Sequence, residues 1–347
     1  MPRVLSAPAP VLTEIEDVTE QGALEALRAE WGGLWQRCPS ATPFQSPEWL
    51  LAWWKHLGSG RPWVIVLRQE GRVAGILPLF VAGSPRTAAF LGTGISDHLD
   101  MLVEPGMGKT AATLFFEHLY RQRHRWGACH LCDIPQGSPL LKVPAGLGLW
   151  IVRAPSTPCP VLDLPSTREE LFSGLSAARR RNLERGIKAL ARNGEILLEM
   201  ADAGNISECV EALFLLHATR WRKKGLPGVL QDDAVRAFHK DAARGLLENG
   251  SLRFHALKLD GKIIAVLYAF ARGGRLFGYL GGFDLAFARF SPGKALLVHA
   301  IGEAMRQGLI RFDFLRGTED YKYAWGARND LKFCLKLEHA RPHRRYE

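Results

Sequence analysis

The chain has 347 residues, enough for two ordinary domains, and its 47% hydrophobic and 23% charged residues are typical of a globular protein. This composition excludes a disordered or fibrous chain, and no apolar run approaches the roughly 18 residues that cross a bilayer. A formal net charge of +10 indicates an acidic partner without choosing among phosphate, nucleotide, RNA and a membrane surface.

Residues 1–12 are predicted to form a flexible lead. The opening MPRVLSAPAPVLTEIED has no apolar core before its acidic residues begin, so we do not interpret it as a signal peptide. Six cysteines show no disulfide-framework spacing, which fits a reducing compartment. We therefore expect a cytoplasmic protein.

The first part of the chain, residues 13–165, is predicted to begin with helices over Glu20–Arg37 and from Ser46, as N-cap, to about Leu57. A hairpin follows over residues 63–80, with a Glu-Gly turn between its strands. A third strand in FLGTGISDHLDMLV leads to a Pro-Gly, to the amphipathic helix KTAATLFFEHLYRQRH and to the strand GACHLCDIP.

Three motifs in this part resemble known sites without meeting their requirements. PGMGKT lacks the first glycine of a P-loop, and GTGISD lacks the third glycine of a dinucleotide fingerprint. Cys129 and Cys132 of CHLC point to opposite faces of a strand, so we expect core cysteines there. No second pair of Cys or His residues has zinc spacing, and we expect no metal.

The second part, residues 166–347, is predicted to repeat this order after a helix over Arg168–Asn193 and the strand EILLEM. Helices over Ile206–Lys224 and Asp232–Asn249 precede a hairpin over 253–270 with an Asp-Gly turn. The strand RLFGYLGGFD, the helix KALLVHAIGEAMRQG and the strand IRFDFLRG follow.

The two hairpins align without a gap at an offset of 190 residues. Four of the 18 pairs are identical and five more are conservative. Because the following strand, Pro-Gly, helix and strand also correspond, we interpret the chain as two tandem copies of one α/β unit.

Two basic segments are candidates for binding. Residues 179–192 carry six Arg or Lys residues and one Glu, which predicts either a solvated amphipathic helix or an electropositive wall for an anionic acceptor. In LHATRWRKKG, one helical face carries a polar and aromatic set that suits either a ligand cleft or a packed Trp with solvated charges: His217, Arg220, Trp221 and Lys224.

The stretch Ser291-Pro292-Gly293-Lys294 stands between a strand and a helix. Proline suits the first helical turn, and glycine lets a ligand approach the backbone. The free N–H groups of a helix start, with Lys294 beside them, would form a phosphate site, although a well-capped helix would look the same.

The order of elements in each copy resembles the GNAT acyltransferase fold. That order is helices, hairpin, third strand, phosphate-cradling loop, helix and strand. Two copies resemble the tandem, Fem-like arrangement. The strings FQSPEWLLAWW, LHATRWRKKG, YLGGFD, FSPGKALL and FDFLRGTEDYKYAW resemble the CelD-type, BioF2-like acetyltransferases named from bacterial cellulose and exopolysaccharide loci. The resemblance covers nearly the whole chain and implies an α/β (α+β) fold with two GNAT-like domains, each a mixed, mostly antiparallel sheet flanked by helices.

This resemblance implies an acyl-CoA co-substrate, acetyl-CoA in the simplest case, bound by the second copy. Gly293-Lys294-Ala295 fits the Gly-x-Ala end of the GNAT loop, whereas Phe290 replaces its usual Gln or Arg. Glu104 of the first copy would repel a phosphate, so that copy is expected to be structural or to hold the acceptor. The expected cofactor-binding residues are Gly281, Gly282, Ser291, Gly293, Lys294 and Ala295.

Acyl transfer to an amine requires a base, a donor to the thioester oxygen and an acid for the departing thiolate. Asp284 and Glu319 are the candidate bases, Tyr321 is the candidate acid, and a distorted strand end at Gly281–Gly282 would supply the donor. The candidates for holding the acceptor are His217, Arg220, Trp221, Arg316 and Lys322.

The prediction is therefore a cytoplasmic N-acyltransferase that acetylates an amino sugar or similar amine in envelope or exopolysaccharide metabolism. Two alternatives stay open. One is a Fem-like transferase that uses aminoacyl-tRNA on a cell-wall precursor, which the positive charge would suit. The other is a non-catalytic binding module that keeps the fold.

Overall fold

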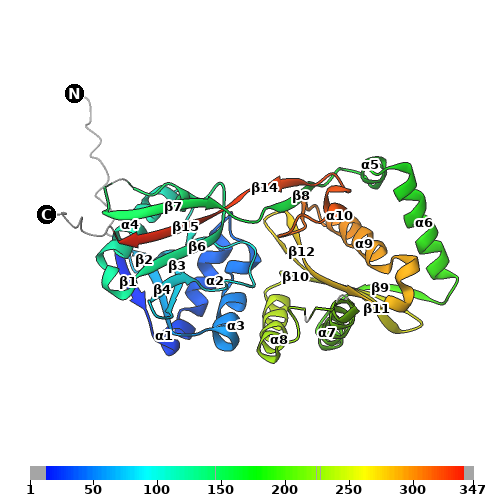
Figure 1. The fold of residues 1–347 in the computed structure, drawn as a ribbon, viewed down its shortest axis with the longest axis horizontal. Helices are drawn as coiled ribbons and strands as arrows, with labels where there is room; N and C mark the ends of the chain where they lie inside the picture. Colours follow the sequence, from blue (N-terminus) through cyan, green and yellow to red (C-terminus); the bar gives the residue numbers. More distant parts are fainter. Residues whose placement is uncertain (1–12, 145, 224, 227, 340–347) are drawn as a thin grey trace, which may run out of the picture.

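The structure, a computed structural model, describes residues 13–144, 146–223, 225–226 and 228–339. Two mixed, mostly antiparallel sheets lie side by side, and helices flank each of them (Figure 1). This confirms the predicted α/β (α+β) class with two tandem units. The predicted lead at residues 1–12 lies outside the described residues.

The first sheet has the strand order β1–β2–β3–β4–β6–β15–β7, and β5 pairs with β3. Helices α1 to α4 accompany it, and we call these elements the first unit. The strands are β1 (Thr13–Val18), β2 (Arg61–Gln69), β3 (Arg72–Ala82), β4 (Thr87–Phe90), β5 (Leu102–Val103), β6 (Ala128–Pro135), β7 (Leu149–Pro155) and β15 (Lys332–His339); the helices are α1 (Gln21–Ala26), α2 (Arg28–Arg37), α3 (Pro47–Leu57) and α4 (Gly108–Arg121).

The second sheet has the order β9–β10–β11–β12–β13–β8–β14. With helices α5 to α10 it forms the second unit. The strands are β8 (Cys159–Asp163), β9 (Ile196–Met200), β10 (Leu252–Leu259), β11 (Lys262–Arg272), β12 (Arg275–Phe283), β13 (Arg311–Asp313) and β14 (Arg328–Asp330); the helices are α5 (Arg168–Ser173), α6 (Ala177–Ala191), α7 (Ile206–Lys223), α8 (Asp233–Glu248), α9 (Pro292–Arg306) and α10 (Asp320–Tyr323).

The two predicted hairpins have the same turn. Glu70 and Gly71 have φ of 51° and 76°, and Asp260 and Gly261 have φ of 48° and 77°. Positive φ at both central residues is the geometry of a type I′ turn, whose twist matches the flanking strands. Each hairpin also shifts register at one place, at Leu67/Arg68 and at Leu257/Lys258, which are 190 residues apart. The duplication therefore extends to the backbone.

One strand of each sheet comes from the part of the chain that otherwise builds the other sheet. β15, near the C-terminus, lies between β6 and β7 of the first sheet, and β8 lies between β13 and β14 of the second (Figure 1). The two strands hold equivalent places, so the units exchange them. The sheets therefore do not divide at the predicted boundary between residues 165 and 166.

The units also share a core. The ring centroids of Trp49 in α3 and Phe238 in α8 lie 4.8 Å apart, and those of Phe44 and Phe270 lie 5.7 Å apart. Around this core, Asp241 accepts hydrogen bonds from Lys55 and His56, each at 2.7 Å. The relative position of the two units is thus fixed by packing as well as by strand exchange.

Capping residues in the sequence predicted most helix ends correctly. The Ser46 hydroxyl accepts a hydrogen bond from the Trp49 N–H at 3.2 Å, as an N-cap should. The helix predicted over Arg168–Asn193 is instead two helices, because α5 ends at Gly174 and Ser176 caps α6 by accepting from the Arg179 N–H.

The cysteine prediction is correct for Cys129 and wrong for Cys132. Cys129 is a buried, free thiol. Cys132 of β6 forms a disulfide with Cys334 of β15. Sequence spacing gave no signal of this bond, because the two residues are 202 positions apart and meet only through strand exchange.

Candidate active site

The parallel strands β12 and β13 form a fork. They pair only over Arg275–Phe277 and Arg311–Asp313, and β12 then continues to Phe283. Beyond β13 the chain turns away at Leu315, whose φ is 57°. Among the described strands, none pairs with the remainder of β12 on this side, so its backbone groups there face the opening of the fork.

A β-bulge distorts β12 inside the fork. Tyr268 of β11 is opposite Leu280 and Ala269 is opposite Gly278, which leaves Tyr279 as the extra residue. We expected the distortion at Gly281–Gly282, and this placement is wrong by two residues. A bulge turns backbone N–H groups out of the hydrogen-bonded ladder. An N–H group freed in this way can donate a hydrogen bond to a thioester oxygen.

The first unit supports this bulge. The Tyr279 hydroxyl donates a hydrogen bond to the Ile95 carbonyl at 3.0 Å. The next residues of the same loop hold the other arm of the fork, since His98 contacts Asp313 at 2.9 Å and Asp97 pairs with Arg316. Sequence analysis missed Tyr279, although it begins the string YLGGFD, and it missed His98, because the contacts of both residues with the other unit cannot be seen in the sequence.

Helix α7 lies close to the free end of β12. A Cβ added to Gly282 would lie 2.9 Å from Leu216 Cβ and 3.1 Å from the His217 nitrogen, so glycine permits this approach. The Arg220 guanidinium lies 5.7 Å from the centroid of the Phe283 ring. His217 is buried beside Trp221, with ring centroids 5.7 Å apart.

Helix α10 and its N-cap Glu319 complete the group. Arg220 acts electrostatically on both Glu319 and Tyr321, which places α10 next to α7. Tyr321 is 49% exposed, and its ring lies 6.1 Å from that of Phe314. The structure therefore brings together, at the end of β12, a carboxylate, a phenol, a guanidinium and an imidazole from segments about 100 residues apart.

Residues 177–323, which contain the whole fork together with α7 and α10, match the family model described as an acetyltransferase (GNAT) domain. These residues form a GNAT domain. No curated protein matches it.

Solved structures show that the GNAT-like fold is present twice. FemX aligns with a TM-score of 0.67 at 13% identity, covering 92% of this chain and 96% of FemX. The C-terminal domain of a protein assigned as a lysylphosphatidylglycerol synthetase from Agrobacterium fabrum aligns at 0.58 and 13%, covering 92% of both chains. A tandem GNAT protein from the clavulanic acid pathway aligns at 0.50 and 14%, covering 95% of this chain and 99% of its own. At these identities the likeness shows the fold alone.

The loop of the GNAT domain that leads into α9 differs from an open phosphate cradle. Ser291 is left-handed, with φ of 54°, and its carbonyl accepts hydrogen bonds from the Lys294 and Ala295 N–H groups at 3.0 and 3.2 Å. Two of the amides expected to meet phosphate are therefore engaged. The Lys294 side chain is exposed, and Ala295 is buried against the core. Gly293 packs near Phe283, since an added Cβ would lie 3.3 Å from its ring.

Asp284 serves as a turn cap. It accepts a hydrogen bond from the Ala286 N–H at 3.0 Å, and it pairs with Lys262 at 3.1 Å. The bond from Ala286 and the Lys262 charge outweigh partial burial and lower the pKa of this carboxyl below its ordinary value. A carboxylate held in this way is a weak base. The pKa of Glu319 is lowered as well, so only its position beside Arg220 and Tyr321 favours Glu319 over Asp284.

Lys322 is committed to the loop that follows β13. Its side chain is 3% exposed, and its ammonium donates to the carbonyls of Arg316, Leu315 and Gly317 at 2.7, 3.1 and 3.3 Å. It also contacts the Glu319 carboxylate at 3.0 Å. Burial raises the pKa of that carboxyl. The Lys322 hydrogen bond, a backbone hydrogen bond and the charges of Lys322 and Arg220 together outweigh burial and leave the pKa lowered.

Neither Arg316 nor Lys322 is therefore placed to orient an acceptor. The guanidinium of Arg316 is taken up by Asp97 and by the Ser96 carbonyl, across the two units. Lys224, the fourth residue of the predicted α7 stripe, lies outside the described residues.

The equivalent region of the first unit has Glu104 where the second unit has Ser291, although Lys109 matches Lys294. Glu104 pairs with Arg37 at 2.6 Å and with Arg72 at 3.4 Å. β4 and β6 pair in parallel like β12 and β13, but the β3–β4 ladder has no register shift comparable to that at Tyr279.

One set of described residues has side chains near enough for metal binding. Ligand atoms of His98, Cys159 and Asp313 lie within 4.8 Å of one another, and all three residues are buried. However, Arg275 contacts Asp313 at 3.1 Å, and the buried Lys332 acts electrostatically on both His98 and Cys159. Two cations beside the cluster oppose a third, so we interpret it as a polar contact between the units.

Proposed function

We propose that the second unit transfers an acyl group, acetyl in the simplest case, from acyl-CoA to an amine such as an amino sugar. The fork between β12 and β13, with its bulge at Tyr279 beside the start of α9, is the observation that carries this proposal. It would supply backbone donors for a thioester oxygen, and the exposed Lys294 in the first turn of α9 would supply a positive charge for a phosphate.

The reaction assigns a role to each neighbouring side chain. The acceptor ammonium loses a proton to Glu319, directly or through water, because a protonated amine has no lone pair for attack. The amine nitrogen then bonds to the thioester carbon, the carbon–sulfur bond breaks, and the nitrogen releases its second proton to water. Tyr321 gives its proton to the departing thiolate. Burial and the Glu319 charge raise the pKa of Tyr321, which keeps it protonated until that step.

His217, Arg220 and Trp221 would form the acceptor side. Burial, and then the Arg220 charge, lower the pKa of His217 to about 4, so its imidazole is neutral near pH 7. Its Nδ1 is buried without a hydrogen-bond partner among the described residues. A neutral imidazole and a neighbouring guanidinium suit the hydroxyl groups of a sugar.

The first test is thermal stability with excess acetyl-CoA. A ligand at about 100 times its dissociation constant adds about 2.7 kcal/mol, and we expect a shift of a few degrees. Free CoA and total tRNA are the comparison ligands, each at low and moderate salt. A shift with acetyl-CoA supports the proposal, and its absence with every acyl-CoA tried would refute it.

A second candidate is Fem-like aminoacyl transfer from tRNA. The exposure of the α6 cations Arg181, Arg185, Lys188 and Arg192 favours it, because such a row could follow a phosphate backbone. A stability shift with tRNA that fades steeply with salt, and none with acetyl-CoA, would select this function.

A further inference from the structure

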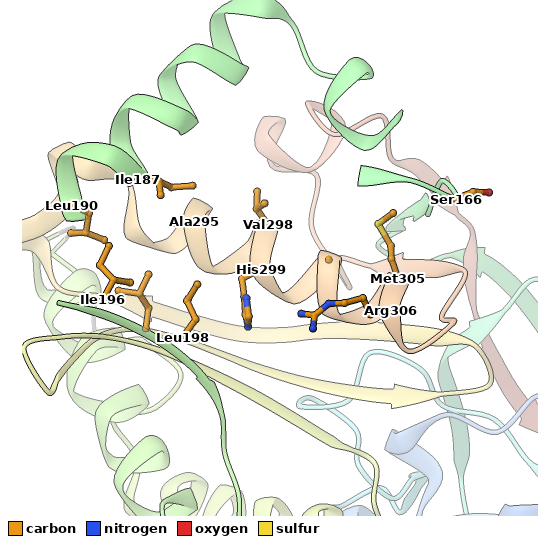
Figure 2. A pocket seen from close by; sticks show the side chains of 12 residues that line it. Ser166, Ile187, Leu190, Ile196, Leu198, Ala295, Val298, His299, Met305 and Arg306 are labelled. Carbon is orange, nitrogen blue, oxygen red and sulfur yellow. The ribbon is translucent and has the colours of Figure 1, made fainter. Parts of the chain in front are cut away.

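A cavity lies away from the fork, between α6, α9 and the strands β9 and β10. Its volume is about 660 Å³, which is in the range of small-molecule sites (Figure 2). Its lining is Ser166, Ile187, Leu190, Ile196, Leu198, Leu257, Ala295, Val298, His299, Gly302, Met305 and Arg306. The proposed acyl transfer uses the N-terminus of α9 and the end of β12, and of the groove's lining only Ala295 belongs to that first turn of α9.

The groove follows α9 from Ala295 to Arg306. At 1.5 Å per residue this path is about 16 Å long. A path of this length along a single helix can hold one extended chain.

The two ends of the groove differ in polarity. Figure 2 shows Ile187, Leu190, Ile196 and Leu198 gathered at one end, whereas His299, Arg306 and Ser166 lie toward the other. Leu198 is 38% exposed, so the apolar wall is not fully covered by the protein itself. An apolar wall with a polar end fits an amphiphile.

A buried, unpartnered imidazole lies behind the polar end. His255 of β10 is 0% exposed, and neither ring nitrogen has a hydrogen-bond partner among the described residues. Its ring lies 5.7 Å from that of His299, which lines the groove. Buried polar groups normally have partners, so this pair points to a polar group that enters from the groove.

The surroundings favour an anion. Arg306 pairs with Glu303, and Arg253 bonds to Gln307 at 2.8 Å, which leaves one net positive charge at the polar end. Above the groove, α6 and its C-cap carry six Arg or Lys residues against one Glu over residues 179–192. The polar end of the groove and α6 therefore both attract a negatively charged ligand.

We propose that this groove binds a single-chain amphiphile with an anionic head group. The tail lies along α9 beneath α6, and the head lies beside His299 and Arg306. The inference does not depend on the acyltransferase function, because no residue of the fork contributes to the lining.

The test titrates the full chain with dodecanoate and dodecyl phosphate below their micelle concentrations, using calorimetry. Dodecanol and dodecyltrimethylammonium are the neutral and cationic comparisons. Gly302→Leu fills the groove, and a Cβ at this helical position meets nothing within 4 Å, so the fold should tolerate it. Gly22→Leu in α1 is the matched control, since its Cβ also meets nothing.

We expect both anions to bind one site, Gly302→Leu to weaken them at least tenfold, and Gly22→Leu to leave binding unchanged. Arg306→Gln should weaken the anions about fivefold or more, whereas Arg244→Gln, on the exposed surface of α8, should not. Binding that survives Gly302→Leu, dodecanol that binds as tightly as dodecanoate, or affinity only for anionic vesicles would each overturn the proposal. The affinity of the Gly302→Leu variant for acetyl-CoA is measured as well, because it tests the proposed acyl-CoA site at the fork separately from the groove.

Discussion

At the scale of single residues, burial decides which polar groups remain available for chemistry. Lys322 and Arg316 are basic residues beside a candidate site, yet both are bound to loop carbonyls or to the other unit. Glu319, Tyr321 and Arg220 lie next to them and remain near the surface of α10 and α7. A basic residue next to a motif is therefore weak evidence of ligand binding until its partners are known.

Lys322→Met should act on stability rather than on substrate binding. The change leaves the carbonyls of Leu315, Arg316 and Gly317 without their shared donor, which should cost about 2 kcal/mol in the free energy of unfolding. Urea unfolding measures this loss. An unchanged unfolding free energy with a raised KM for the acceptor would restore Lys322 as a substrate-binding residue.

At the scale of elements, the exchange of β8 and β15 makes each sheet depend on the other part of the chain. β15 pairs with β6 and with β7, so it closes the first sheet although it follows the last strand of the second. The Cys132–Cys334 disulfide joins the same neighbours. The two units should therefore unfold together.

Leu335→Ala tests this dependence. Leu335 of β15 is 1% exposed, and loss of its buried side chain should cost about 2–5 kcal/mol. Amide hydrogen exchange should show protection lost first in β6 and β7, about 200 residues earlier in the chain. Loss of protection in β13 with full protection kept in β6 would contradict the exchange of strands between the two units.

Sequence reasoning succeeded where the signal is local. The turns at Glu70–Gly71 and Asp260–Gly261, the cap at Ser46 and the repeated order of elements follow from neighbouring residues and backbone preference. The bulge at Tyr279 and the position of β15 depend on contacts with distant segments, which one sequence does not reveal. For the same reason the site residues were found as separate candidates, and the partners of Asp284, Arg316 and Lys322 were not.

At the scale of the whole molecule, buried histidines couple folding to pH. Burial lowers the pKa of His217, His239 and His255 to about 4, 3 and 4, so these side chains are neutral in the folded protein. In the unfolded chain they take up protons below about pH 6.5. Their contribution to stability is therefore present above that pH and is lost as the pH falls.

We expect the free energy of unfolding to be nearly constant from pH 8 to 7 and to fall between pH 6.5 and 5. Each of these histidines contributes up to about 1.4 kcal/mol per pH unit. Asp313, with a pKa of about 2, should add to the loss only below about pH 4. Urea unfolding across this range measures the slope, and His239→Gln should reduce it. A flat profile down to pH 5 would contradict the account.

The central claim, that the fork of the second unit binds acyl-CoA, is tested most directly by calorimetric titration of acetyl-CoA into three proteins. These are the unmodified chain, Lys294→Glu in the first turn of α9, and Lys109→Glu in the first turn of α4, its counterpart in the first unit. Both lysines are exposed, so both variants should fold. We predict that Lys294→Glu weakens binding about tenfold, as expected for the loss of about 1.4 kcal/mol from one charged contact, while Lys109→Glu binds normally. No binding to the unmodified chain, or a loss of binding in Lys109→Glu alone, would contradict it.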